Sequence, residues 1–261
     1  MAHQLDAVRL KLERAKERLR AFDSESGEWL EQTELCIFVP EDHAVERVFF
    51  ARITATPPAR FSTILGDCLQ NLRASLDYLA WALVLVNHHT PNDGTYFPIY
   101  RNGHRPGKHF RPKCLTGVDP KAIAIIERLQ PNYGGQNPDL HLLWFLRELS
   151  NHDKHREINV VVGRLVVNTF RFYMRFGEDV RIMPTVSVDA SILNDGAKVA
   201  SYRLAALAGG EPLRVEAENI GFLTLGDALP WGATAVSRQI EGIWWAITED
   251  ILPLFEQFFP S

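Results

Sequence analysis

A long run of leucines at helical spacing, between Phe61 and about Asn87, constrains the fold of this chain more than any other feature. Along it a leucine or valine recurs every three or four residues, at Leu65, Leu69, Leu72, Leu76, Leu79, Leu83 and Val86. The second half of the segment is apolar on nearly all sides. Because a helix of this kind is buried in a soluble protein, we expect it in the middle of the fold.

Apolar residues spaced three and four apart predict further helices. The first begins near the N-terminus and is expected to end at Gly27, because glycine is a stop signal for helices. A short helix is expected at about 119–130, and another is expected to begin at Pro138 and to end at residue 156. The last helix is expected at about 234–259, with a bend near Pro253.

Strands are expected on both sides of the central helices. The segments 33–39 and 46–54 are rich in β-branched and aromatic residues and predict two strands joined by a turn at 40–42. From 158 to about 225 the hydrophobic period changes to two, which predicts an antiparallel sheet. Because strands and helices do not alternate, the predicted fold class is α+β, a bundle of long helices packed with an antiparallel β-sheet.

Composition indicates one ordinary globular domain. The chain has 261 residues, of which 46% are hydrophobic and 23% charged, with a net charge of −4. These values exclude collagen-like, disordered and disulfide-rich classes, and they argue against a general nucleic-acid coat. With no linker or repeat in view, we expect a single domain over 1–261, with a helical core at about 60–157 and a β-rich region at about 158–225.

Several functional classes have no support in the sequence. Motifs for dinucleotides, for the P-loop, for zincins and for the hydrolase nucleophile elbow are missing, and we expect no cofactor. The longest apolar run, 79–86, is far short of the ~20 residues that span a membrane, so no membrane partner is expected. Three cysteines without a C-x-x-C pair indicate a reducing compartment, and we expect a cytoplasmic protein.

A first pair of charged residues lies beside the leucine stripe. Arg73 and Asp77 are four residues apart, so a helix brings them together near its buried face. Charges are not placed there without partners. Two interpretations stay open: part of a functional site, or an intrahelical ion pair at the edge of the core.

A second charged group closes the helix that follows Pro138. Helical spacing from Leu142, Leu146 and Leu149 places Asp153 and then Arg156 on the line that faces the core. Because buried charges are costly unless paired, we expect these two residues to meet other charges, with Arg73 and Asp77 as the candidates.

The neighbours of Asp153 add a candidate acid or base. His155 lies to the side of the apolar line and can move protons near neutral pH. The alternative is that Lys154, His155 and Arg156 only complement the dipole at the end of the helix. Glu148, His152 and His155 share a face, but a metal would need further ligands from elsewhere, so no metal site is expected.

A basic loop over 101–113 contains no acid, and the next one along the chain is Asp119. In a net acidic protein such a loop suits an anion or a phosphate, and a solvated loop is the alternative. The candidate anion-binding residues are Arg101, Arg105, Lys108, His109 and Arg111, together with Lys154. A weaker candidate is the alternating strand face of Arg171, Tyr173 and Arg175, which suits either a nucleic-acid platform or the wet side of a sheet.

Four segments carry a resemblance to a known group of proteins. They are GDCLQNLRASLDYLAWAL (66–83), YFPI (96–99), LQPNY (129–133) and LWFLRELSNHDKHRE (143–157). Together they resemble an uncharacterised bacterial and phage protein family. The arginine-led helix also resembles HEPN-type helical domains, many of which cleave RNA and carry a histidine that four to six residues separate from the arginine. Here Tyr78 stands at the first of those positions, so the resemblance implies that His155 supplies the histidine from another helix.

Two functions are therefore carried forward. The first is a HEPN-like, metal-independent nuclease directed at RNA, or a related phosphoryl-transfer protein. In it Arg73 and Arg156 stabilise phosphate charge, His155 moves protons, and Asp77 and Asp153 orient those groups. The basic loop holds RNA or another phosphate-containing ligand, and a homodimer is left open. The second is a non-enzymatic binding or regulatory protein whose charged cluster is a buried structural network. A small-molecule enzyme that uses the same pocket is not separated from the first by sequence.

Overall fold

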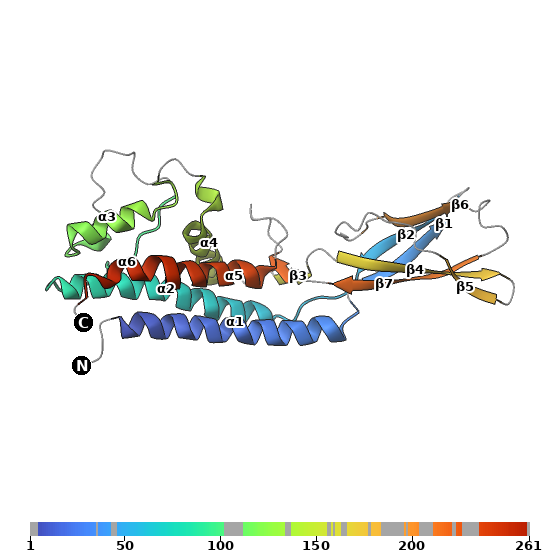
Figure 1. Cartoon of the computed structure of the whole chain (residues 1–261), viewed down its shortest axis with the longest axis horizontal. Coiled ribbons are helices and arrows are strands. Elements are labelled where there is room, and N and C mark those ends of the chain that lie inside the picture. Colours follow the sequence, from blue (N-terminus) through green and yellow to red (C-terminus); the bar gives the residue numbers. More distant parts are fainter. Residues whose placement is uncertain are drawn as a thin grey trace. The chain divides into compact units, whose positions relative to one another are not determined.

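The computed structural model contains helices and antiparallel strands, which confirms the α+β class (Figure 1). Its contacts divide the chain into two compact units, Met1–Ser24 with Ala59–Asn159 and Asp227–Ser261, and Glu25–Pro58 with Val160–Gly226. A single domain with helices packed on the sheet stays a prediction. The residues that the structure describes are 5–34, 36–42, 46–101, 112–133, 137–155, 158, 160–162, 166–176, 179–183, 196, 198–203, 211–220, 223–225 and 235–259.

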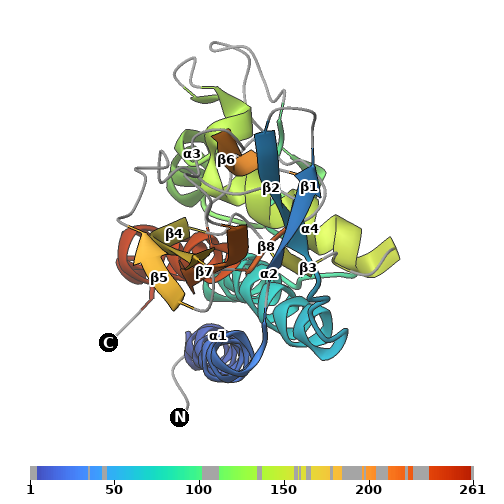
Figure 2. The ribbon, with the colours of Figure 1, turned by 90° about the vertical axis from the view of Figure 1, so that its right-hand side faces the viewer.

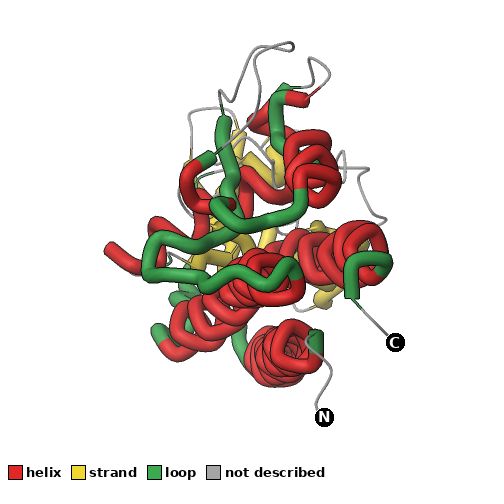
Figure 3. Tube along the Cα trace, turned by 90° about the vertical axis from the view of Figure 1, so that its left-hand side faces the viewer, coloured by secondary structure: helices red, strands yellow, loops and turns green. Residues whose placement is uncertain are grey.

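Long helices that lie side by side form the frame of the first unit. They are α1 (Asp6–Gln32), α2 (Arg60–Val86), and the continuous run of α5 (Val236–Trp245), a π-helical turn (Ala246–Ile251) and α6 (Leu252–Glu256). The first helix runs antiparallel to the others (Figure 1). Arg9 near its start pairs with Glu256 (3.0 Å), and Lys16 further along pairs with Glu241 (2.8 Å). Figure 3 shows these helices nearly end-on, with loop segments crossing their near end.

The predicted leucine stripe of α2 is buried, but the helix is not covered on every side. All six leucines of the stripe are at most 1% exposed. The structure corrects the expectation for the opposite face, where Tyr78, Trp81 and Leu85 are 42–45% exposed. The reason is that α1 and α4 (Leu142–His155) pack on other sides of α2.

Shorter helices connect the long ones in the first unit. After α2 the chain passes through a 3-10 turn (Lys113–Leu115) into α3 (Pro120–Arg128), whose first turn is capped by Asp119. The helix expected from Pro138 begins later, at Leu142, because Pro138–Leu140 form a separate 3-10 turn. His141 then accepts the Leu143 N–H through Nδ1 (3.2 Å) and so acts as the cap of α4.

Two other helix boundaries differ from the predictions. Helix α1 continues through Gly27 to Gln32, because a single glycine costs a helix only about 1 kcal/mol and good helix formers follow it. The C-terminal helix widens into a π-helical turn just before Pro253. Proline lacks an N–H and crowds the preceding turn, which accounts for this irregularity where a bend was expected.

The second unit is built from antiparallel strands, which face the viewer in Figure 2. One sheet has the order β1-β2-β6, another the order β5-β4-β7, and β3 pairs with β8. The strands are β1 (Cys36–Asp42), β2 (Glu46–Ile53), β3 (Val160–Val162), β4 (Val166–Phe176), β5 (Asp179–Met183), β6 (Lys198–Arg203), β7 (Glu211–Ile220) and β8 (Leu223–Leu225). The antiparallel region expected at 158–225 is thereby confirmed.

The turn expected at 40–42 is wrong, because Pro40–Asp42 belong to β1 and pair with β2. Proline is accepted there since β1 is an edge strand, where a missing N–H leaves no ladder bond unmade. In the middle of the other sheet, Arg171 and Arg175 of β4 lie opposite Glu216 and Glu211 of β7. At these register positions each of the two arginines thus has an acid opposite it on the neighbouring strand.

No helix within the described ranges is both long enough and apolar enough to cross a membrane.

Candidate functional site

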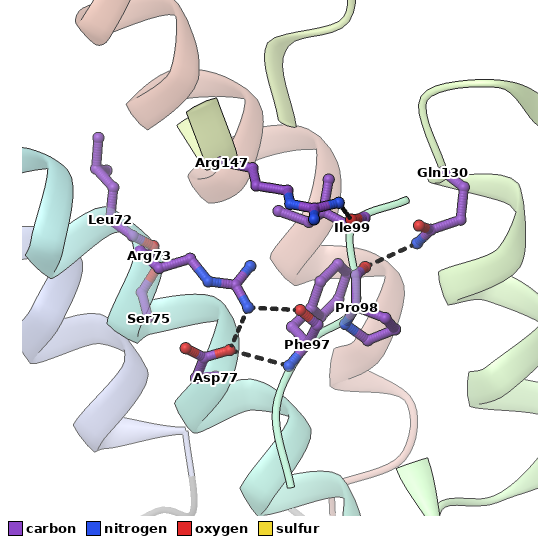
Figure 4. A network of polar contacts seen from close by, with 9 residues as sticks. All are labelled: Leu72, Arg73, Ser75, Asp77, Phe97, Pro98, Ile99, Gln130 and Arg147. Carbon is purple, nitrogen blue, oxygen red and sulfur yellow. Dashed lines mark hydrogen bonds and ion pairs between the residues drawn. The ribbon is translucent and has the colours of Figure 1, made fainter. Parts of the chain in front are cut away.

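Arg73 and Asp77 are an ion pair that holds one residue of the loop after α2 (Figure 4). The Arg73 Nη2 group donates to Asp77 Oδ1 (2.7 Å) and to the carbonyl oxygen of Phe97 (2.6 Å). The backbone N–H of Phe97 in turn donates to Asp77 Oδ1 (2.9 Å). We call these three residues the Phe97 clamp. Both backbone polar groups of a fully buried residue are therefore satisfied by charged side chains.

The residues after Phe97 are held in the same way by side chains of α4 and of the turn that follows α3. Gln130 donates through Nε2 to the Pro98 carbonyl (3.0 Å), and its Oε1 accepts the Tyr100 N–H (2.9 Å). Arg147 of α4 donates through Nη1 to the Ile99 carbonyl (2.6 Å). Figure 4 shows the Gln130 and Arg147 side chains approaching the segment from different parts of the chain. Side chains thus satisfy the backbone N–H and carbonyl groups of this segment, as a neighbouring strand does in a sheet.

Burial governs the electrostatics of the clamp. The side chains of Arg73 and Asp77 are 15% and 32% exposed. Burial lowers the pKa of Arg73, the Asp77 carboxylate opposes this shift, and the positive charge of Arg147 adds to it. The second terminal nitrogen of Arg73, Nη1, is buried and has no hydrogen-bond partner within the described part of the chain. Two guanidinium groups and one carboxylate therefore share this interior.

A cysteine and two tyrosines that the sequence patterns did not single out lie beside the clamp. Tyr96 and Tyr100 each form a side-chain hydrogen bond with the Cys114 thiol, which is buried. Burial is the main reason that the pKa of Cys114 is raised, and burial with the neighbouring thiol raises the pKa of Tyr100 to about 12. A thiol with a raised pKa is a poor nucleophile, so this cluster is suited to packing rather than to covalent chemistry. No spacing pattern in the sequence predicts this cluster of a cysteine and two tyrosines.

Asp153 belongs to α4 and contacts α2 at another point, beside Gly66 and Gln70. Its Oδ2 atom accepts a hydrogen bond from the Gln70 side-chain amide (3.0 Å). Its Oδ1 atom lies so close to Gly66 that a Cβ at that position would collide with it. Both residues line a pocket of about 200 Å³, which we call the Asp153 pocket, formed by Ser62, Thr63, Gly66, Asp67, Gln70, Asp153 and Ile158.

The structure does not pair Asp153 with Arg73 and Asp77 as the sequence suggests. The charged partner expected for Asp153 is replaced by the neutral amide of Gln70, while Arg73 and Asp77 bind each other and Phe97. His155 ends α4, but the side chains of Lys154 and His155 and the whole of Arg156 lie outside what the structure describes.

Most of the predicted anion-binding loop also lies outside the described residues, namely Arg105, Lys108, His109 and Arg111. Arg101 is described, and it forms an ion pair with an acidic residue: its Nε and Nη2 donate to the Asp139 carboxylate at 2.9 and 2.8 Å. That contact raises the pKa of Arg101, and its guanidinium also lies 5.8 Å from the Trp144 ring centre. The segment 101–113 contains no acidic residue, but Asp139, which is distant in sequence, contacts its first residue in the folded chain.

A larger hollow of about 520 Å³ lies around the start of α3. Its lining is mainly apolar, with Lys113 and Glu127 as its charged members. It contains none of the predicted catalytic or anion-binding residues.

Two further expectations can be placed. Tyr78 is 44% exposed and its ring lies 5.6 Å from the Lys11 ammonium of α1. Within the described residues, no group of three or more histidine, cysteine or acidic side chains is arranged to hold a metal.

No protein family, curated protein or solved structure was found to match this chain. The site therefore has to be interpreted from its own geometry.

Proposed function

We propose that this chain is a non-enzymatic binding or regulatory protein, in which Arg73 and Asp77 form a structural network that fixes the helices. The observation that carries the proposal is that both charged groups of the pair bind the backbone of one buried residue, Phe97. A catalytic guanidinium or carboxylate has to meet a substrate. Here the same groups are engaged by the protein itself, and Arg73 is only 15% exposed.

The surroundings of the clamp support a structural role in the same way. Gln130 and Arg147 bind the next residues of the segment, so α2, α4 and the turn after α3 all meet this loop through hydrogen bonds from side chain to backbone. Networks of hydrogen bonds from side chain to buried backbone, such as this one, rigidify a protein and specify one arrangement of its elements. A rigid helical frame of this kind suits a protein that presents binding surfaces.

The test combines stability with activity. Arg73→Lys keeps the charge but not the forked geometry, so we expect the melting temperature to fall by about 5 °C in calorimetry. The purified wild-type chain is expected to leave a mixture of RNA substrates intact. Cleavage of RNA by the wild type that is lost in Arg73→Lys, with an unchanged melting temperature, would overturn the proposal.

A second candidate function is favoured by the position of Asp153 at a pocket rather than in the core. In this alternative the chain is a HEPN-like, metal-independent nuclease or phosphoryl-transfer protein that acts on RNA or on another phosphate-containing ligand. Asp153 orients the reacting groups, and His155 and Arg156, which follow it closely in the sequence, move protons and stabilise phosphate charge.

The alternative makes its own prediction about His155. In the presence of a chelator, the wild-type chain would cleave RNA, and His155→Ala would lose that activity while it keeps the melting temperature of the wild type. Intact RNA with the wild-type chain, and cellular toxicity unchanged by His155→Ala, would exclude this function.

A further inference from the structure

A row of large apolar side chains on α2 faces away from the core. Tyr78, Trp81 and Leu85 are spaced three and four residues apart, so they lie on one face of the helix, and they are 44%, 42% and 45% exposed. Ala74, four residues before Tyr78, continues the same line. We call these four residues the Trp81 row. Their spacing is that of the a and d positions of a coiled coil, which pack against a second helix.

The part of α2 that carries this row has the composition of a fully covered helix. From Tyr78 to Val86 it contains no charged residue, and a helix that is apolar on all sides is ordinarily buried on all sides. Figure 1 shows α2 continuing past the N-terminal end of α1, so α1 does not cover this end of α2. Contiguous exposed apolar surface, unlike single scattered side chains, marks an interaction site. The Trp81 row is therefore a surface that a partner completes.

A lysine at the edge of the Trp81 row indicates the charge of that partner. The Lys11 ammonium of α1 lies 5.6 Å from the centre of the Tyr78 ring and donates to the side-chain oxygen of Asn71 (3.3 Å). Neither contact neutralises its charge. Among the described residues Lys11 forms no ion pair.

The acidic side chains of α2 beside the row are engaged elsewhere. Asp67 and Asp77 each pair with an arginine, at 3.4 and 2.7 Å. The undescribed segments that precede α1 and follow the clamped loop, 1–4 and 102–111, contain no acidic residue. Lys11 is therefore the charge that meets a partner at this edge, and it attracts an acidic side chain.

This combination fits an amphipathic helix better than other partners. A lipid surface or a nucleic-acid backbone takes clusters of several basic residues, whereas Lys11 is the one unneutralised base seen at the row within the described ranges. A second copy of the chain would bring another lysine, and the acids beside its own row already hold arginines. Side chains at three- and four-residue spacing match the ridges of another helix.

We propose that the Trp81 row binds an amphipathic helix of a partner protein, with the apolar face of that helix on Tyr78, Trp81 and Leu85 and an acidic side chain on Lys11. Helices are commonly recognised through anchors at this spacing. The inference rests on the proposed binding function and names the class of partner that the helical frame takes.

The experiment measures the fluorescence anisotropy of labelled peptides titrated with the full chain. The probes are peptides of about 18 residues, long enough to be helical, with a row of leucines at heptad spacing and glutamates at different places beside it. Control peptides carry lysine in place of each glutamate. We expect at least one glutamate peptide to bind at low salt and its lysine counterpart to bind about fivefold more weakly, because attraction to Lys11 becomes repulsion.

Variants of exposed residues locate the binding. Leu85→Asp places a charge in the row and is expected to weaken the glutamate peptide about tenfold or more, and Trp81→Gln, a milder change, to weaken it several-fold. Lys11→Glu is expected to reverse the preference, so that the lysine peptide binds more tightly. Leu10→Asp is the matched control with unchanged binding, because Leu10 is 63% exposed on the outer face of α1. Circular dichroism spectra and melting curves show that each variant is folded.

Several results would overturn this inference. They are the absence of binding by every glutamate peptide, equal binding of glutamate and lysine peptides, and binding that survives Leu85→Asp. The inference also fails if Leu85→Asp separates a dimer of the wild-type chain in sedimentation, or abolishes binding to phosphatidylglycerol vesicles or to single-stranded RNA. In those cases a second copy, a lipid surface or a nucleic acid covers the row.

The inference and the proposed function fail separately. The proposed function is overturned by RNA cleavage, whatever the peptide titrations give. If no peptide binds and RNA stays intact, only the inference about the Trp81 row fails.

Discussion

The Phe97 clamp and the Asp153 pocket lie on one face of α2, yet their charged side chains have different kinds of partner. Gly66, Gln70, Arg73 and Asp77 are spaced four, three and four residues apart, so they form one polar line along the helix. At the clamp the charges bind each other and a buried backbone. At the pocket the acid accepts a hydrogen bond from a neutral amide. Of the charges beside the apolar stripe, one pair thus holds a buried backbone segment, whereas the acid at the pocket lies against a neutral side chain.

The largest effect is expected at the clamp. Arg73→Met removes the guanidinium and leaves the Phe97 carbonyl and the Asp77 carboxylate without this donor. We expect the free energy of unfolding in urea to fall by about 3 kcal/mol, because a broken pair leaves a partly buried charge and an unpaired carbonyl. Arg128→Met, on the exposed side of α3, is the matched control and should change it little. A change as small as that of the control would show that the clamp is not structural.

The second effect tests how closely Gly66 and Asp153 depend on each other. In a helix, Gly→Ala by itself stabilises by about 1 kcal/mol, but at Gly66 the new Cβ collides with the Asp153 carboxylate and disturbs its bond to Gln70. We therefore expect Gly66→Ala to stabilise the Asp153→Ala variant and not the wild type. A double-mutant cycle in urea should give a coupling of about 1–2 kcal/mol. Additive effects would mean that Asp153 does not rest on Gly66.

The third effect concerns pH and the tyrosines beside the clamp. Burial and the Cys114 thiol raise the pKa of Tyr100 to about 12, from 10.0. Between these two values the unfolded chain loses the tyrosine proton while the folded chain keeps it, so the stability of the fold decreases as the pH rises through this window.

Removal of the Tyr100 hydroxyl should reduce that loss. When the pH rises from about 9 to 11, we expect the free energy of unfolding to fall by about 1 kcal/mol less in Tyr100→Phe than in the wild type. The expected difference is kept this small because the Tyr100 side chain is partly exposed to solvent. Urea midpoints across this range measure it, with Tyr133→Phe, an exposed tyrosine, as the control. Parallel curves for wild type and Tyr100→Phe would contradict the expectation.

The sequence was informative where a single periodicity decides the structure. The helical spacing located α2 and its buried leucines, and the change to period two located the strands after residue 158. It was less informative where tertiary contacts override local signals. Pro40 is accepted in a strand only because β1 is at a sheet edge, and the exposed stripe of Tyr78, Trp81 and Leu85 reflects which neighbours cover α2. Neither fact is contained in local spacing.

For the candidate site, spacing identified the Arg73–Asp77 pair but not its partners. A backbone contact to Phe97 comes from a loop 20 to 24 residues away and has no pattern in the sequence. Asp153 stands out in the sequence as an acid on an apolar line, yet its partner Gln70 is neutral and does not stand out among charged residues. Similarly, Asp139 approaches Arg101 from 38 residues away and changes the character of the basic loop.

The smallest effect contrasts the two carboxylates directly. Asp77→Asn weakens a pair with a mostly buried arginine, and we expect it to lower the free energy of unfolding by about 1–2 kcal/mol. Asp153→Asn keeps an oxygen that accepts from Gln70 and loses no ion pair seen within the described residues, so a change below about 0.5 kcal/mol is expected. Urea unfolding of both variants at neutral pH measures the difference. Equal losses would mean that Asp153 is a structural charge like Asp77, whereas near-neutral stability of Asp153→Asn would show that the fold does not depend on the Asp153 charge.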